Sequence, residues 1–289
     1  MKPQFARRNR PVVLLLLSLA MVLPACAQTP AATGPTTAPA PLAGQPASTA
    51  ATEPATEPAG DDPAAVKILD ALERAGRMYP TIRAEIDYHV EMIELGDSET
   101  RSGWVAYQRD FSADDEKIRI HFETLRQGEG PNRRERLDYT FDGQWAAEAK
   151  HGIKQLTRYQ VAPPGQKVRA LQIGKGPFPP LPFGQKTQEV LSHYHAASPA
   201  VAADGPPATD YLLLTARRDK QKDLNFTRLE MWVDHKTALP VKIVGYEKDK
   251  NIHTVSLRNV QGGAEFPADM FELKKGFGWT EEIRPYQRD

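Results

Sequence analysis

The side chains that most often carry chemistry are not spaced as catalytic or metal-binding motifs in this 289-residue chain. His193 and His195 form the closest histidine pair. On a strand they would share one face, as metal ligands can, but the surrounding sequence predicts a helix, on which this spacing separates them. The sequence also has no Gly-x-Ser-x-Gly elbow, no His-Glu-x-x-His pair and no phosphate-binding loop. We therefore expect no metal, no cofactor and no enzyme activity.

Cys26 is the only cysteine in the chain. It follows a basic N-terminus and an apolar stretch from Val12 to Leu23, which is too short to span a bilayer but is typical of a secretory signal peptide. The sequence Leu23-Pro24-Ala25-Cys26 resembles a bacterial lipobox. This resemblance implies that residues 1–25 are removed and that a diacylglycerol is attached to Cys26.

A diacylglycerol anchor supplies two acyl chains, which suffice for stable membrane attachment. Ala27 follows the cysteine, at the place where an Asp retains lipoproteins in the inner membrane of well-studied envelopes. We therefore expect a cell-envelope protein that is anchored in the outer membrane and faces the periplasm. The alternative is an ordinary signal peptide cut near Ala25, Ala27 or Gln28, with an incidental cysteine.

Residues 26–62 are rich in Ala, Pro and Thr and have no hydrophobic period. Such a segment buries too little apolar surface to offset its ordering entropy, so it predicts a disordered tether with a reach of roughly 30–35 Å. The folded domain is then residues 63–289. The first 25 residues hold four of the 37 basic residues and no acidic one, which leaves 33 basic against 37 acidic residues, a net charge of −4. This charge does not favour nucleic acid as a partner.

The first element expected in the domain is a helix, with Asp62 as its cap, Pro63 as its first residue and Gly76 near its end. After Pro80 the apolar residues alternate with polar ones, which is typical of strands with one buried face. The expected strands are 84–92, 104–109, 118–122, 137–141, 145–149, 155–161, 211–217, 226–233, 241–248 and 252–260.

A second helix is predicted from Thr187 to His195, a Pro- and Phe-rich connector at 176–184, and a surface loop at 196–207. Many strands in sequence-adjacent hairpins, with few helices, indicate a mainly β (α+β) fold. The expected architecture is a curved antiparallel sheet, or unclosed β-barrel, with a helical lid.

Four short stretches resemble the LolA/LolB lipoprotein-localisation superfamily: 141–145, 229–234, 239–243 and 266–273. The resemblance implies an unclosed β-barrel with a helical lid over an apolar cavity, and binding of the acyl chains of lipids or lipoproteins. The expected lipid anchor favours the receptor-like branch over the soluble carrier. No individual functional residue of the superfamily can be placed on this chain.

The residues in the apolar phase of the strands are the candidates for lining such a cavity. They are Ile86, Tyr88, Val90, Trp104, Ile118, Ile120, Phe122, Leu229, Met231, Val255 and Leu257. The simpler interpretation is that each belongs to the packed core.

The resulting hypothesis is a monomeric, non-catalytic carrier or receptor in lipoprotein sorting. Its partners would be acyl chains in the cavity and a membrane reached through the anchor. A lipid-sensing signalling or interaction module and an envelope hydrolase are the alternatives.

Overall fold

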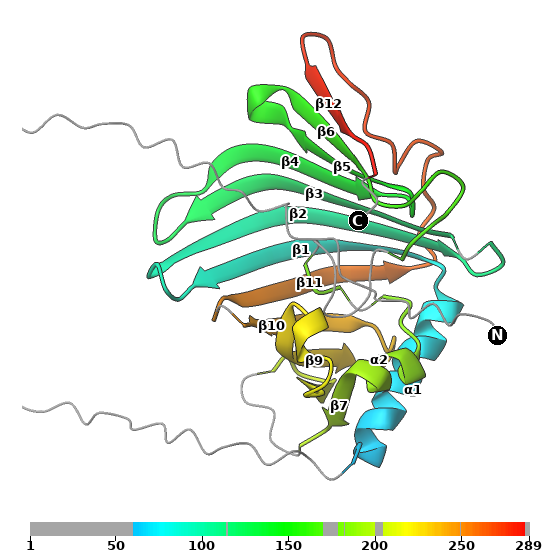
Figure 1. Cartoon of the computed structure of the whole chain (residues 1–289). Helices are drawn as coiled ribbons and strands as arrows, with labels where there is room; N and C mark the ends of the chain where they lie inside the picture. Colours follow the sequence, from blue (N-terminus) through cyan, green and yellow to red (C-terminus); the bar gives the residue numbers. More distant parts are fainter. Residues whose placement is uncertain are drawn as a thin grey trace, which may run out of the picture.

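The computed structural model describes residues 60–286, except 114, 170–178, 182, 200–204 and 249. The predicted signal peptide, Cys26 and nearly all of the predicted tether therefore lie outside the described residues. Figure 1 shows one large curved sheet with two helices packed at one side of it. The prediction of a mainly β fold with a curved sheet and a helical lid is confirmed.

Twelve strands form the sheet within the described residues, in the order β12-β6-β5-β4-β3-β2-β1-β11-β10-β9-β8-β7. Their bounds are β1 Thr81–Met92, β2 Asp97–Asp110, β3 Asp115–Gln127, β4 Arg133–Phe141, β5 Trp145–Lys150, β6 Gln155–Gln160, β7 Tyr194–Ala197, β8 Thr209–Ala216, β9 Phe226–Asp234, β10 Pro240–Glu247, β11 Ile252–Gly262 and β12 Thr280–Arg284. Two antiparallel meanders, β1–β6 and β7–β11, meet where β1 pairs with β11.

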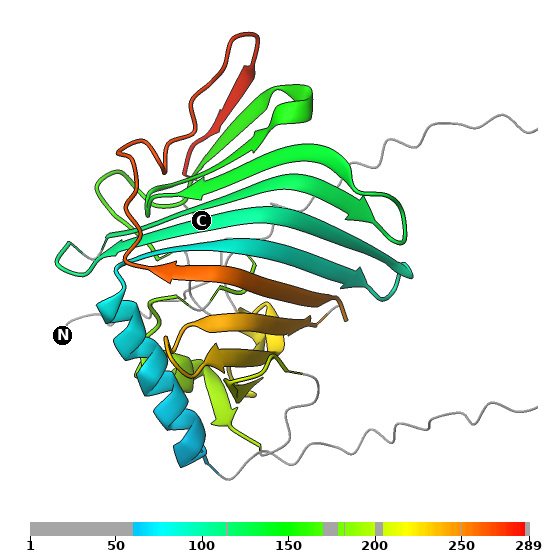
Figure 2. The ribbon, with the colours of Figure 1, turned by 180° about the vertical axis from the view of Figure 1, so that it is seen from behind.

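The strand β12 departs from the expected antiparallel sheet, because it pairs with β6 in parallel. The chain reaches it from β11 through residues 263–279, which we call the C-terminal segment (Figure 2). The sequence of β12 has no alternation of apolar and polar residues that would predict a strand, and all five of its residues are exposed. A strand with neither face buried lacks the period-two signal on which sequence prediction depends.

The two faces of the sheet have opposite character. Residues directly opposite each other on neighbouring strands lie on the same face. Ile86, Gly103 and Phe122 are aligned in this way on the face that we call the inner face, and Glu85, Trp104 and His121 on the outer face. The inner face holds the main hydrophobic cluster, which also includes the buried side of α1.

Helix α1 spans Pro63–Met78 and packs against β7, β8 and α2 (Figure 1). Its start is as predicted: Asp62 accepts a hydrogen bond from the Ala64 amide at 2.8 Å, and Pro63 opens the first turn. This cap satisfies one of the amides that a helix start leaves without a partner. No helix in the described part of the chain is long and apolar enough to cross a bilayer.

Helix α2 is shorter than predicted, because it spans Thr187–His193 and not Thr187–His195. Tyr194 adopts an extended backbone (φ −128°, ψ 149°), and β7 begins there and pairs with β8. The predicted loop from residue 196 also starts late, since β7 includes Ala196 and Ala197. Two single-turn 3-10 helices complete the fold, His151–Ile153 (η1) and Gln221–Asp223 (η2).

Candidate binding face

The inner face brings together ten of the eleven residues predicted to line a cavity. Ile86, Ile118, Ile120, Phe122, Leu229, Met231, Val255 and Leu257 are buried there, while Tyr88 and Val90 are half-buried. Most of them belong to one continuous hydrophobic cluster. Their role as ligand contacts stays a prediction.

Trp104 is the exception, because it lies on the outer face. It is paired with Glu85 and His121, and its ring stacks on His121 with centroids 5.3 Å apart. The guanidinium carbons of Arg83 and Arg119 lie 5.2 and 5.4 Å from its ring centroid. Both phases of β2 carry large apolar residues, so alternation alone does not show which phase faces inward.

The chain itself supplies part of what covers the inner face. Between β6 and α2 it runs through residues 161–185, and we call the described residues of this stretch the strap. Leu181 and Phe183 of the strap are each 2% exposed and belong to the inner-face cluster. The ring of Phe183 packs on Tyr107 of β2, with centroids 5.4 Å apart. Phe178 of the predicted Pro- and Phe-rich connector lies outside the described residues.

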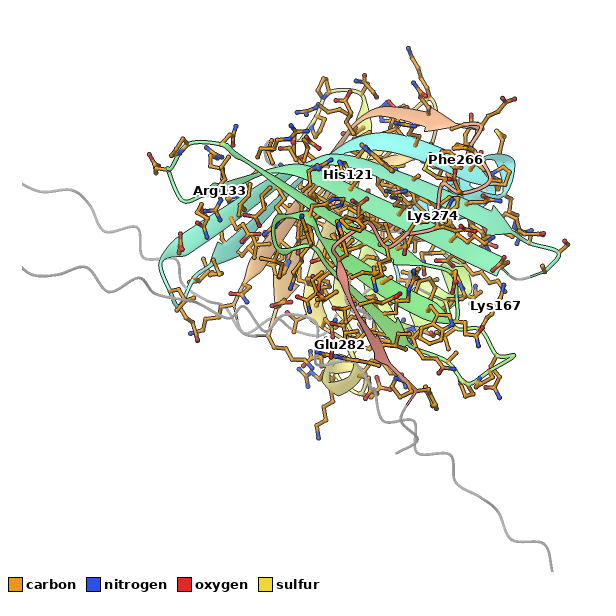
Figure 3. The ribbon with its side chains drawn as sticks, turned by 90° about the horizontal axis from the view of Figure 1, so that it is seen from above. His121, Arg133, Lys167, Phe266, Lys274 and Glu282 are labelled. Carbon is orange, nitrogen blue, oxygen red and sulfur yellow. The ribbon has the colours of Figure 1, made fainter. Side chains whose placement is uncertain are left out.

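Charged groups hold the strap in place. Lys167 forms an ion pair with Asp115 (2.6 Å), and Figure 3 shows Lys167 at the opposite end of the sheet from Arg133. Arg169 pairs with Glu189 of α2 (Nη1–Oε2, 2.6 Å) and donates from Nη2 to the Gly184 carbonyl at 2.9 Å. The Lys167–Asp115 pair is partly exposed and contributes at most about 1 kcal/mol, whereas the Arg169 side chain is largely buried.

Three polar side chains, Tyr88, His253 and Glu247, contact one another beside the apolar cluster, close to the β10–β11 turn. The Tyr88 hydroxyl and His253 Nδ1 are 2.6 Å apart, and His253 Nε2 lies 3.2 Å from Glu247. Burial raises the pKa of Tyr88, so its hydroxyl stays protonated and donates. Burial alone would raise the pKa of Glu247, but the hydrogen bond from His253 lowers it.

His253 is not among the residues that the sequence predicts for the cavity, although a signal for it exists. It lies two residues before Val255, in the same phase as the predicted cavity residues. Both of its ring nitrogens face a partner, Tyr88 on one side and Glu247 on the other. This arrangement fixes the ring, and it directs neither ring nitrogen at a substrate, as a general base would require.

The outer face holds a charged cluster around a buried carboxylate. Asp138 is 1% exposed and accepts from Arg119 Nη2 at 2.8 Å and from His151 Nε2 at 2.7 Å. His121 Nδ1 lies 3.1 Å from the same carboxylate. Burial alone would raise the pKa of Asp138, but hydrogen bonds from His121 and Arg119 lower it to about 2. The hydrogen bond to Asp138 in turn raises the pKa of His121.

The C-terminal segment lies over this part of the outer face, and Figure 3 labels Phe266 and Lys274 of the segment and His121 of β3. Arg119 donates to the Met270 carbonyl at 3.0 Å, and Arg158 donates to the Leu273 carbonyl at 2.6 Å. Leu273 also packs into a small apolar cluster on β5 and β6. Among the described residues, no three His, Cys, Asp or Glu side chains are grouped as metal ligands.

His193 and His195 do not lie on one helix, although the sequence predicts that they do. His193 ends α2, and its Nδ1 lies 2.8 Å from the Glu189 carbonyl. His195 belongs to β7, and its Nδ1 lies 3.9 Å from Asp61. The two histidines therefore lie on different elements and contact different partners.

Comparison with known proteins gives distant structural matches only. No family model and no curated protein sequence matches the chain. The MucA/MucB complex structure of Pseudomonas aeruginosa matches at 15% identity and a TM-score of 0.40, covering 73% of this chain but 61% of the matched chain. An uncharacterized conserved protein from Thermus thermophilus matches at 10% identity and a TM-score of 0.44, covering 76% of this chain and 99% of that one.

A LolA superfamily protein from Nitrosomonas europaea matches at 9% identity and a TM-score of 0.34, covering 72% of this chain and 97% of that one.

Proposed function

We propose that this domain binds acyl chains of lipids or lipoproteins on the inner face of its sheet, without catalysis. One observation carries the proposal: two apolar side chains that fill the inner face, Leu181 and Phe183, come from the irregular strap and not from a strand or helix. A connector held by ion pairs can leave more easily than a strand held by a hydrogen-bonded ladder. Its departure would leave an apolar surface of the kind that an acyl chain covers.

The energetics favour exchange of the strap for an acyl chain. Each buried methylene contributes about 0.8 kcal/mol, so six methylenes contribute about 5 kcal/mol before ordering costs. Displacing the strap exposes both Leu181 and Phe183, which costs about 1.5–3 kcal/mol for each side chain, so a net gain requires an acyl stretch longer than six methylenes.

The place of the domain in the cell is part of the same proposal. Attachment through Cys26, with residues 26–62 as a tether, would hold the binding face within a few nanometres of the outer membrane. A monomer suffices for this role, because the proposed binding residues all belong to one sheet.

Photo-crosslinking in membranes tests the proposal. The full chain is expressed in bacteria fed a diazirine fatty acid, irradiated in its own membranes, and digested to locate the labelled peptides. We expect label on inner-face strands, and more label in Phe183→Ala, because that change empties part of the inner face and loosens the strap. Phe266→Ala is the matched control, since it removes the same ring from the C-terminal segment. Absence of inner-face label in both wild type and Phe183→Ala would reject the proposal.

A further inference from the structure

Two neighbouring turns carry exposed apolar side chains at one end of the molecule. The first is η1, between β5 and β6, where Ile153 is 66% exposed. The second is the turn 276–279 just before β12, where Phe277 is fully exposed. The Thr280 amide donates to the Lys154 carbonyl at 3.0 Å, so the two turns lie side by side. We call residues 151–154 and 274–279 together the tip.

The turn before β12 is held by Trp279. The Trp279 amide donates to the Gly276 carbonyl at 3.3 Å, and its ring packs edge-on against His151 with centroids 5.0 Å apart. Gly278 has φ +75°, an angle that glycine adopts without strain. Phe277 lies between these fixed points, and its ring is left in water while that of Trp279 joins a small apolar cluster.

The ionised side chains of the tip itself are basic. Lys154, Lys274 and Lys275 belong to it, and no Asp or Glu does. Within the described part of the chain, Lys154 and Lys275 form no ion pair. Lys274 pairs with Asp269 at 3.0 Å, but both side chains are mostly exposed, so this pair is weak and can exchange for another anion.

The carboxylates around the tip lie behind it, and most have a cation of their own. The pairs are Glu148 with Lys150, Asp138 with Arg119, Glu281 with Arg158 and Glu282 with Arg284. Glu272 is the remaining acidic neighbour, and it acts on Lys274 through space. Set against Glu272, Lys154 and Lys275 leave an excess of one positive charge, beside the exposed ring of Phe277.

Another turn with exposed apolar side chains has the opposite charge. Ile93 and Leu95 are exposed in the β1–β2 turn, but Glu91, Glu94 and Asp97 flank them. An anionic surface repels this turn and attracts the tip, so charge separates the two.

We propose that the tip docks on the surface of an anionic lipid bilayer. Phe277 and Ile153 enter the headgroup region, and Lys154 and Lys275 contact lipid phosphates. Apolar rings flanked by lysines suit this interface, because the ring leaves water while the ammonium groups stay among the headgroups.

This contact is separate from the other proposed contacts of the chain. Figure 1 shows the turn before β12 and the start of α1 at opposite ends of the molecule, so the tip is not the place where a tether from Cys26 would join. No inner-face residue takes part, so the docking does not depend on acyl-chain binding.

Quenching by spin-labelled lipids tests the docking. The full chain is reconstituted in vesicles of phosphatidylcholine and phosphatidylglycerol with spin labels on the acyl chains. A fluorescent NBD probe is attached to Gly152→Cys in η1, where an added Cβ meets nothing within 4 Å. Lys222→Cys is the matched position, because it is also exposed on a single-turn 3-10 helix. Wild type, whose one cysteine is Cys26, gives the labelling blank.

We expect stronger quenching of the probe in η1 than of the probe in η2. With the probe in η1, Phe277→Ser and Lys275→Gln should each lower the quenching by about two- to fivefold. Leu95→Ser and Lys222→Gln remove an exposed apolar group and an exposed charge elsewhere, and should leave it unchanged.

Equal quenching of the two probes would overturn the docking. A loss in Leu95→Ser as large as that in Phe277→Ser would do the same, because it would show no preference for the tip. Quenching that is as strong in pure phosphatidylcholine, and unaffected by Lys275→Gln, would overturn the assignment of an anionic surface.

Discussion

The inner and outer faces of this sheet are covered in two different ways. The inner face is covered by apolar side chains, and nine of its ten predicted cavity residues belong to, or pack against, the cluster that also holds side chains of α1 and the strap. The outer face around Asp138 is covered by the C-terminal segment, whose backbone carbonyls accept from Arg119 and Arg158. The inner face is stabilised by removal of apolar surface from water. The outer face is stabilised by hydrogen bonds and ion pairs of charged side chains. The two faces should therefore respond differently to mutation and to pH.

The largest effect is expected from shortening an inner-face side chain. Phe122→Ala should lower the free energy of unfolding by about 3–5 kcal/mol, because Phe122 is 2% exposed and its removal leaves a cavity. Phe266→Ala, in the C-terminal segment, should cost about 1 kcal/mol or less. Urea unfolding of both variants measures the difference. Equal losses would show that the C-terminal segment is as well packed as the inner face.

The next effect concerns the buried carboxylate of the outer face. Asp138→Ala should cost about 3 kcal/mol, because it leaves Arg119, His121 and His151 without their shared partner. The pKa of Asp138 is about 2, below its ordinary 3.8, so the stability it supplies is present above about pH 4 and is lost as pH falls towards 2. The variant should therefore show a flatter acid limb in a plot of unfolding free energy against pH.

An exposed ion pair on the same face gives the control for this prediction. Asp87 pairs with Arg258 Nη1 at 2.6 Å, and both side chains are partly exposed. Asp87→Ala should cost less than about 1 kcal/mol. If Asp87→Ala lowered the free energy of unfolding as much as Asp138→Ala does, the burial of Asp138 would add nothing to the stability of the outer-face cluster.

Trp104 tests where the boundary between the two faces lies. Trp104→Ala should cost about 1–2 kcal/mol, through the lost contacts with Arg83, Arg119 and His121. It should leave fatty-acid labelling of the inner face unchanged, because its ring is on the outer side. The same crosslinking experiment gives this readout, and a drop in inner-face label would place Trp104 in the binding surface after all.

The smallest effect is a pH dependence near neutrality. The hydrogen bond to Asp138 raises the pKa of His121, so the folded chain holds this proton more tightly than the unfolded chain. That contribution is fully present below about pH 6.5 and is lost as pH rises through the folded pKa. His121→Gln should remove this slope, which amounts to less than about 1 kcal/mol because the His121 ring keeps part of its surface in water. Melting temperatures at pH 6, 7, 8 and 9 measure it, and an unchanged slope would assign the effect to another group.

Sequence reasoning recovered the fold where a local rule applied. The cap at Asp62 and the alternation in β3 and the first half of β1 have signals within a few residues, and the structure confirms them. In β9 the burial does not alternate, because residues 229–233 are buried on both faces of the sheet. It failed where the decisive contact was distant. The extended backbone at Tyr194 depends on pairing with β8, and β12 depends on pairing with β6, more than a hundred residues earlier.

The candidate site shows the same division. Ten cavity candidates share one face because successive residues of a strand point to opposite faces of the sheet, so one apolar residue that is known to face inward assigns the others. The phase of β2 was misread at Trp104 because arginines from other strands cover an apolar ring on the outer side. The Arg169–Glu116 pair and the Tyr88–His253 contact join residues 53 and 165 positions apart, and no spacing rule predicts them.

The parallel pairing of β12 with β6 has a consequence for self-association. An unpaired edge strand offers its free amides and carbonyls as a template on which a second copy can add. The edge of β6 is occupied by β12, which is only five residues long and carries Glu281, Glu282 and Arg284. A short, charged outermost strand is a poor template for further addition, so the sheet resists strand addition at this edge.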